Sequence, residues 1–284
     1  MPALWKAADD ASAANQRLFF NVKRWELVGL VTGALAALLP TSWLWGFGPG
    51  LSVLAFLLVV ALQVASIGPR AEARWYDARA AAESIKSASW QYAVGGEAFR
   101  LKDADSDARF FERLREILNA VPKLDIGPAS GATAGVTSGM RAIRGRPRAE
   151  RMSIYRDFRV QDQVQWYARK ADENRARGRL FKVIIIVVES AAVIYGLIRY
   201  KFELDTDILG VLAATGAGLI AWAQAKKYAF LAESYSVTSH EIELVAATLE
   251  SVASEDQWAQ LVHDSEAAFS REHTMWQARR QGPA

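Results

Sequence analysis

The amino-acid sequence predicts an all-α integral membrane protein with four transmembrane helices in two hairpins, and long helices extending from them into a cytoplasmic helical bundle. Three observations predict this fold class. The apolar residues of the 284-residue chain are concentrated in two blocks, a short segment divides each block, and basic residues flank both. The mean hydropathy of +0.02 hides this pattern, because it averages the blocks with strongly charged segments.

The first apolar block covers residues 25–67. Residues 27–39 carry no charge, and residues 51–67 are apolar except for two serines and a glutamine. Each half, with its flanks, approaches the ~20 residues that cross a bilayer core. The segment between them contains tryptophan, glycine and Pro40, which favour a membrane interface and a turn. These features predict a tight transmembrane hairpin.

The second apolar block contains residues 183–198 and 208–223, separated by a charged connector. Glu189, Ser190 and Thr215 are among its few polar residues. The alternative to a second transmembrane hairpin is a soluble protein with long buried helices. A soluble helix normally keeps a polar stripe where its outer face meets water, and these segments have almost none. The pattern therefore favours membrane spans.

Lysine and arginine predict the orientation of the spans. Basic residues lie before the first and third spans and after the second and fourth, while the connector inside each hairpin has no excess of them. The positive-inside rule then places both termini and the middle segment in the cytoplasm. A cleavable signal peptide is not expected, because the polar stretch before the first span is long and no small-residue cleavage site follows a short apolar region.

Helical stripes follow each hairpin. Small and apolar residues recur every three or four positions over residues 75–92 and again over 228–249, beginning where a span ends. This continuity predicts that the second span of each hairpin extends as one long helix into the cytoplasm. A shorter helix is expected over residues 106–119, with Phe110, Leu114 and Ile117 facing inward. A last helix is expected from Ser254, with Gln257 completing a capping box.

The chain divides into two related halves. Residues 1–120 are expected to form the first two-span unit with its cytoplasmic helices, residues 121–151 a linker rich in Gly, Pro and Arg, and residues 152–284 the second two-span unit. An internal repeat is indicated by short motifs that occur in the same order around both hairpins. They are Arg17-Leu18-Phe19 with Arg179-Leu180-Phe181, and Ala82-Glu83-Ser84 with Ala232-Glu233-Ser234.

Four polar residues are candidates to line a pore: Glu189, Ser190, Glu26 and Thr215. An ionisable group in hydrocarbon costs about 2.5–3.5 kcal/mol on insertion scales, so it usually faces water or a partner. Glu189 lies about two turns inside the third span. Two interpretations of it stand side by side, a cation-attracting or proton site and a buried carboxylate that is paired or protonated. Glu26 can instead reach the headgroups or pair with Lys23 or Arg24.

A basic patch precedes the second half. Five arginines are candidates to bind an anionic lipid or ligand: Arg141, Arg144, Arg146, Arg148 and Arg151. Each basic residue near an anionic membrane surface contributes ~1 kcal/mol. The alternative is a solvated, positive-inside surface, which the orientation argument favours.

Several classes of function are excluded or disfavoured. The chain has no cysteine, so disulfides, thiol nucleophiles and zinc–thiolate sites are absent. Its three histidines, His240, His263 and His273, lack metal-ligand spacing. No phosphate-binding loop or nucleophile elbow occurs. We therefore expect no enzyme, catalytic residue, cofactor, metal or nucleic-acid partner.

Three segments carry a resemblance to a known family. They are RWYDARAAAESIKSASWQYAVGG (Arg74–Gly96), VQDQVQWYARKADENRARGRLFK (Val160–Lys182) and WAQLVHDSEAAFSREHTMW (Trp258–Trp276). They resemble the bacterial SLATT family of two-span membrane domains, here in tandem over most of the chain. The resemblance implies a pore-forming effector of bacterial conflict systems, associated with nucleotide signalling, in the bacterial plasma (inner) membrane. The family has no catalytic signature to carry over.

Three functional hypotheses follow. The first is a homo-oligomeric channel or pore in the lipid bilayer that conducts ions or small solutes, as a gated effector in bacterial defence. The second is a non-conducting membrane-anchored scaffold that recruits a cytoplasmic partner. The third, a transporter, requires broken helices at matching positions in both halves, and only Pro40 interrupts a span-like segment.

Overall fold

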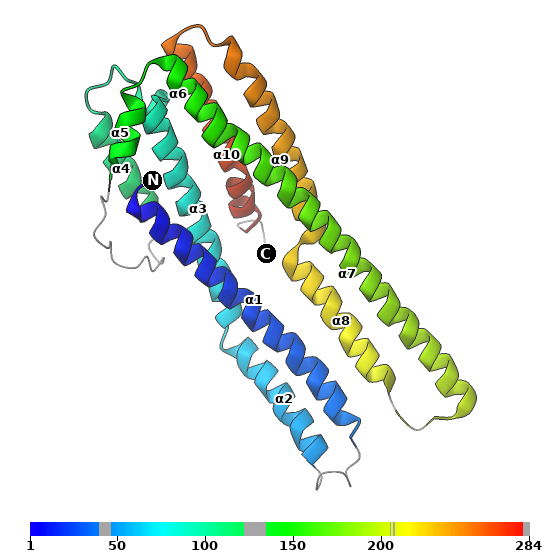
Figure 1. Ribbon diagram of the computed structural model, residues 1–284. Coiled ribbons are helices and arrows are strands. Elements are labelled where there is room, and N and C mark those ends of the chain that lie inside the picture. Colours follow the sequence, from blue (N-terminus) through cyan, green and yellow to red (C-terminus); the bar gives the residue numbers. More distant parts are fainter. Residues whose placement is uncertain (40–46, 122–134, 205, 207, 281–284) are drawn as a thin grey trace. The chain divides into compact units, whose positions relative to one another are not determined.

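The computed structural model describes residues 1–39, 47–121, 135–204, 206 and 208–280 (Figure 1). This part of the chain is built from helices and their connections, and contains no strand. The helices are α1 (Ala3–Ala37), α2 (Phe47–Val64), α3 (Ile67–Val94), α4 (Ser106–Asn119), α5 (Ser138–Arg144), α6 (Arg148–Tyr155), α7 (Gln161–Phe202), α8 (Ile208–Lys226), α9 (Tyr228–Thr248) and α10 (Glu255–Arg280). Helix α5 and the first turn of α6 thus lie within residues 121–151.

The chain forms two compact units, each described here by itself. The hairpin unit consists of Gln16–Glu72 and Asp172–Ala232, and the bundle unit consists of Met1–Asn15, Ala73–Ala171 and Glu233–Ala284. Both units therefore draw residues from the two halves of the sequence.

Three helical stretches of the described chain are long and apolar enough to cross a membrane, judged by length and composition. They are Phe47–Val64 (α2), Arg148–Phe202 (which contains α7) and Ile208–Thr248 (which contains α8 and α9). The second, third and fourth predicted spans fall in these stretches. The first predicted span falls in the later part of α1, where the described helix ends at Ala37 and charged residues precede the apolar run. Pro40 lies outside the described residues.

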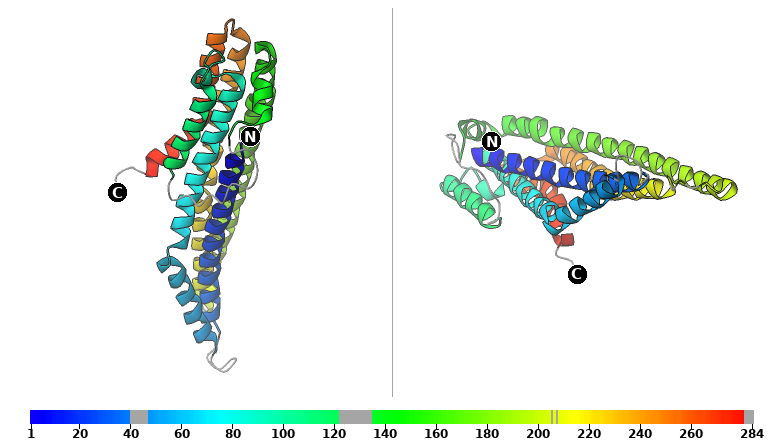
Figure 2. Two further views of the ribbon diagram at one scale, coloured as in Figure 1. Left: turned by 90° about the vertical axis from the view of Figure 1, so that its left-hand side faces the viewer. Right: turned by 90° about the horizontal axis from the view of Figure 1, so that it is seen from below.

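In the hairpin unit, α1 and α2 pack against each other through small residues and lie side by side in both views (Figures 1 and 2). A Cβ atom at Gly29 would lie 2.7 Å from Cγ2 of Val59, and the hydroxyl of Ser52 donates to the carbonyl of Gly33 at 2.9 Å. The buried residues of α2 are small, whereas its leucines are exposed. This inside-out distribution is typical of helices that pack in lipid.

Helices α2 and α8 are each followed by a break at which one residue lies in the left-handed region. These residues are Ser66 (φ 51°), between α2 and α3, and Lys227 (φ 53°), between α8 and α9. The expectation of one continuous helix across each boundary was therefore wrong. At the first boundary the cause is Pro69, which has no N–H to bond the carbonyl of Ala65. The guanidinium of Arg70 donates to that carbonyl instead.

Glycine at Ser66 is expected to stabilise the protein. A side chain in the left-handed region costs roughly 1–2 kcal/mol, and glycine avoids this cost while losing more chain entropy, so Ser66→Gly should raise the melting temperature slightly. The control is Ser84→Gly, inside the regular helix α3, which should lower it. Thermal unfolding in detergent, followed by circular dichroism, measures both. Equal shifts of the same sign would contradict the prediction.

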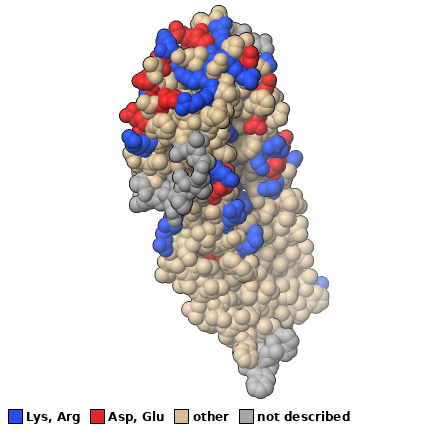
Figure 3. Space-filling model, turned by 60° about the vertical axis from the view of Figure 1, so that its left-hand side comes forward, with Lys and Arg blue, Asp and Glu red and all other residues tan. Residues whose placement is uncertain are grey.

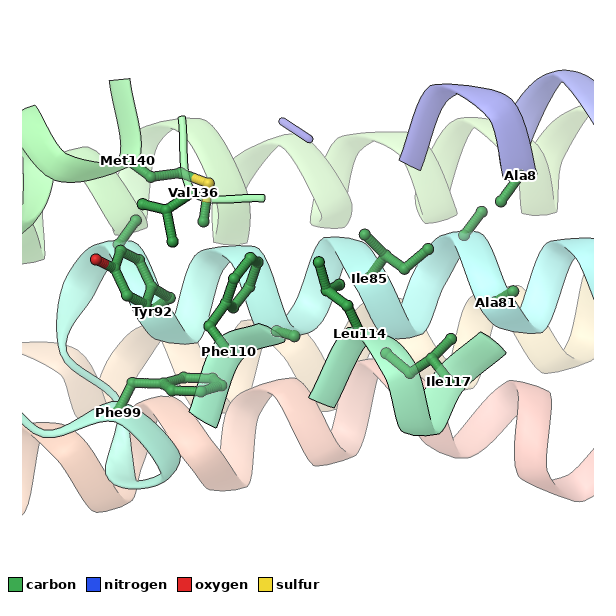
Figure 4. Close-up of a cluster of buried hydrophobic side chains, with 13 residues drawn as sticks. Ala8, Ala81, Ile85, Tyr92, Phe99, Phe110, Leu114, Ile117, Val136 and Met140 are labelled. Atoms are coloured by element: carbon green, nitrogen blue, oxygen red, sulfur yellow. The ribbon is translucent and has the colours of Figure 1, made fainter. Parts of the chain in front are cut away.

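The bundle unit contains a first hydrophobic cluster around α3 (Figure 4). Ile85 and Tyr92 of α3 pack with Phe110, Leu114 and Ile117 of α4. The predicted helix over residues 106–119 and its inward face are confirmed. Ala8 of α1 and Met140 of α5 complete the same cluster.

A second cluster joins the end of α3 with α6, α7, α9 and α10. Its central residue is Trp258 of α10, which is fully buried against Tyr155, with ring centroids 5.7 Å apart. The predicted capping box is confirmed, because Gln257 N donates to Ser254 Oγ and Ser254 N donates to Gln257 Oε1, each at 3.2 Å. This box fixes the start of α10 and hence the position of Trp258.

Candidate functional site

Glu189 and Ser190 lie on the exposed surface of α7, inside its apolar part. None of the residues in the most apolar part of this helical stretch is buried. Ile186, Val193 and Tyr200 follow the same side of the helix and are 50%, 64% and 88% exposed. Figure 3 shows a face on which a wide region has almost no charged atoms while Lys, Arg, Asp and Glu gather elsewhere. An exposed carboxylate on an apolar helix is therefore the outstanding feature of the hairpin unit.

Glu26 and Thr215, the other two pore candidates, have different surroundings. Glu26 is 8% exposed and pairs with Lys23, whose Nζ lies 2.8 Å from Oε2 of the carboxylate. Thr215 is half-buried and donates to the carbonyl of Val211 in its own helix at 2.8 Å. Glu189 and Ser190 are thus exposed, whereas Glu26 and Thr215 are buried or half-buried. Of the two carboxylates, Glu189 is the more exposed.

The five predicted arginines of the basic patch lie in α5, α6 and the turn between them. Arg141 and Arg146 are exposed and pair with carboxylates, at 2.7 Å from Asp107 and 3.0 Å from Glu150. Arg148 donates to the carbonyl of Ala253 at 2.7 Å. Exposed ion pairs such as those of Arg141 and Arg146 contribute little stability.

Arg144 binds the backbone between α3 and α4. It donates to the carbonyls of Tyr92 and Phe99 at 2.8 Å and of Arg100 at 3.0 Å, and to Ser106 Oγ at 2.9 Å. Its guanidinium also lies 4.8 Å from the centre of the Tyr92 ring. Burial lowers the pKa of Arg144 below its ordinary value. The side chain therefore organises this turn.

Arg151 is 1% exposed and is likewise used inside the bundle unit. It donates to the carbonyls of Val94 and Arg146 and forms an ion pair with Glu255 at the start of α10. Arg144 and Arg151, two of the five predicted arginines, therefore use their donors for contacts inside the bundle unit.

A buried ion pair connects the π-helical turn between α6 and α7 (Arg156–Val160) with α10. Arg159 and Glu266 form two hydrogen bonds, of 2.9 Å (Nε to Oε1) and 2.7 Å (Nη2 to Oε2), and their side chains are 2% and 0% exposed. The Tyr155 hydroxyl also donates to Glu266 Oε1 at 2.9 Å. Arg159 Nη1 is buried without a hydrogen-bond partner in the described part of the chain. Neither Arg159 nor Glu266 is among the candidate residues predicted from the sequence.

The electrostatics of this cluster keep the Arg159 guanidinium charged. Burial lowers the pKa of Arg159, but the charge and hydrogen bonds of Glu266 outweigh burial and raise it overall. Burial also raises the pKa of Tyr155, and the charge of Glu266 raises it further. Neither group exchanges a proton near neutral pH. The cluster is therefore suited to holding α6, α7 and α10 together rather than to acid–base chemistry.

The described residues contain no group of three or more His, Cys, Asp or Glu side chains that could hold a metal ion. His240 is exposed, with Nδ1 3.4 Å from Glu243. His263 has a buried Nδ1 with no hydrogen-bond partner among the described residues. The side chain of His273 lies outside the described part.

The start of α10 closes onto the turn that follows α3. Trp258 Nε1 donates to the carbonyl of Val94 at 2.8 Å. Asp256 pairs with Arg100 at 2.7 Å and with Lys102 at 3.2 Å. Helix α10 therefore makes polar and apolar contacts with the first half of the sequence.

Two adjoining regions match family descriptions. Residues 2–152 match the SMODS and SLOG-associating 2TM effector domain 3, and residues 155–276 match the SMODS and SLOG-associating 2TM effector domain 1. The first match covers more than half of the chain. No curated protein and no solved structure matches it. The boundary between the matched regions falls at the end of α6, and α10 of the second region contacts the α3–α4 turn of the first.

Proposed function

The chain belongs to the SLATT family as a tandem of two of its domains, and from this premise we propose an oligomeric membrane effector that conducts ions or small solutes. The observation that carries the proposal is the exposure of Glu189 on the apolar surface of α7. Family membership supports the membrane location and the effector role. Conduction and assembly are the steps that the proposal adds.

A single chain in a bilayer would expose Glu189 to hydrocarbon. A charge there costs about 2.5–3.5 kcal/mol on insertion scales, and the neighbouring residues on the same side of α7 offer it no cover. Several copies that surround a water-filled path would hydrate the carboxylate, and a ring of carboxylates selects cations. We therefore place Glu189 and Ser190 in the path, with α7 of each copy beside it.

We further propose that the later part of α1 also crosses the membrane, as the first of four spans. Helix α2 is apolar and long enough to cross a membrane. If both ends of this hairpin lie on the same side of the membrane, a second crossing must accompany α2. Helix α1 is suited to that role, because it packs along α2 from Gly29 to Gly33. The positive-inside rule then gives cytoplasmic termini in a bacterial inner membrane.

To test this proposal, the ionic current is recorded across planar bilayers that contain the purified full-length chain. Wild type should give discrete openings that prefer cations to chloride, and Glu189→Gln should lose much of that preference because the ring charge is removed. The control is Glu112→Gln, an exposed carboxylate of α4, which should behave like wild type.

Openings that Glu189→Gln leaves unchanged would take this residue out of the path. Silence from protein shown to be folded and inserted would reject conduction, and would favour the scaffold hypothesis, in which the bundle unit recruits a cytoplasmic partner.

A further inference from the structure

The last residue of α8, Lys226, is half-buried against two aromatic rings of the hairpin unit. Its Nζ lies 3.3 Å from the centre of the Phe20 ring and 5.1 Å from that of Trp222. The two rings are 5.9 Å apart and tilted by 60°. Aromatic faces attract a cation, so the rings hold the ammonium in one place.

Two more cations converge on this lysine from other helices. Arg24 of α1 and Arg177 of α7 are exposed, and both act electrostatically on the Lys226 ammonium. Neighbouring basic residues have carboxylate partners, since Lys23 pairs with Glu26 at 2.8 Å and Arg175 with Asp172 at 2.7 Å. Arg177 and Arg24 thus add positive charge near Lys226, and like charges held together repel unless an anion lies between them.

The cluster stands where apolar segments begin and end. Arg24 and Arg177 precede the apolar runs of α1 and α7, and Lys226 follows that of α8. Trp222 lies one turn before Lys226, and tryptophan favours the membrane–water boundary. The ends of these apolar runs are where we expect the lipid headgroups.

We propose that Lys226, Arg24 and Arg177 form a binding site for a phosphate group, and that the phosphate belongs to an anionic phospholipid. The fixed ammonium gives the site its centre, and the two arginines, which bind phosphate through several donors, surround it. The half-buried rings of Phe20 and Trp222 suit the apolar part of a lipid better than a soluble anion. The site is separate from the five arginines of α5 and α6, and it does not depend on conduction.

The test is equilibrium binding of fluorescent phosphatidylglycerol to the full-length protein in non-ionic detergent. Unlabelled phosphatidylglycerol should displace the probe, while phosphatidylcholine should not. At ~1 kcal/mol per basic residue, each of Lys226→Met, Arg24→Gln and Arg177→Gln should weaken binding by about five-fold. Lys226→Arg keeps the charge and should bind nearly as wild type does.

Two matched controls separate this site from general charge effects. Lys201→Met removes a lysine whose Nζ lies 5.5 Å from the Phe202 ring at the other end of α7, and Arg175→Gln removes an arginine that already has a carboxylate partner. Both should leave binding unchanged. Wild-type binding by Lys226→Met would overturn the proposal, and so would displacement of the probe by inorganic phosphate as effectively as by phosphatidylglycerol. If Lys226→Met does not fold, Arg24→Gln and Arg177→Gln decide.

Discussion

Replacing Glu266 with alanine is expected to destabilise the bundle unit by about 3–5 kcal/mol. The substitution leaves the guanidinium of Arg159 buried without its carboxylate partner, and the Tyr155 hydroxyl loses its acceptor. A buried charge without a partner is far more costly than the loss of an exposed ion pair. Urea unfolding of the full-length protein in detergent, followed by circular dichroism, measures the change.

Two further variants test the cause of this effect. Asp264→Ala removes an exposed carboxylate two residues away, whose partner is Gln260 at 2.9 Å, and should change stability by less than about 1 kcal/mol. The double variant Arg159→Met, Glu266→Leu replaces the whole pair by apolar side chains and should recover most of the lost stability. A double variant no more stable than Glu266→Ala would show that packing, rather than the unpaired charge, sets the cost.

Trp258→Ala should have an effect of similar size, about 3–5 kcal/mol, for a different reason. The indole is fully buried, and its removal leaves a cavity beside Tyr155. The carbonyl of Val94 keeps a donor from Arg151, so the cavity, rather than an unsatisfied acceptor, accounts for most of the loss.

The same unfolding experiment measures this prediction, with Leu244→Ala as the control. Leu244 is 70% exposed on α9 and should tolerate the change. Because Trp258 contacts residues from both matched regions, its loss should destabilise them together, in one transition. Two separate transitions in the wild-type protein would contradict a shared core.

Much of the fold could be predicted from the sequence, where the signal is local. The spacing of Phe110, Leu114 and Ile117 predicted α4 and its buried side, and Ser254 with Gln257 predicted the cap of α10. The left-handed residue at Ser66 follows from Pro69, but no proline or glycine marks Lys227. The periodicity of the sequence therefore does not predict the break at Lys227.

The candidate site could be predicted only in part. Glu189 was identified because a charged residue within an apolar run can be recognised from the sequence alone. The partner of Arg159 lies 107 residues away, so no local pattern identifies it. One signal was present, since Glu266 follows Val262 by four residues and precedes Phe269 by three, on the side of α10 that is buried. A carboxylate on such a stripe calls for a buried cation, and Arg159 provides it.

The tandem arrangement fixes the stoichiometry of charge in any assembly of this protein. Aligning the two Arg-Leu-Phe motifs places Leu27 at the position that corresponds to Glu189. One polypeptide therefore contributes two unlike hairpins, and only one of them carries the carboxylate of α7. The order of the rotation axis in a ring of such chains equals the number of chains, although the ring holds twice as many hairpins. Its α7 carboxylates equal the chains in number, which gives half the charge density of a ring built from identical charged hairpins.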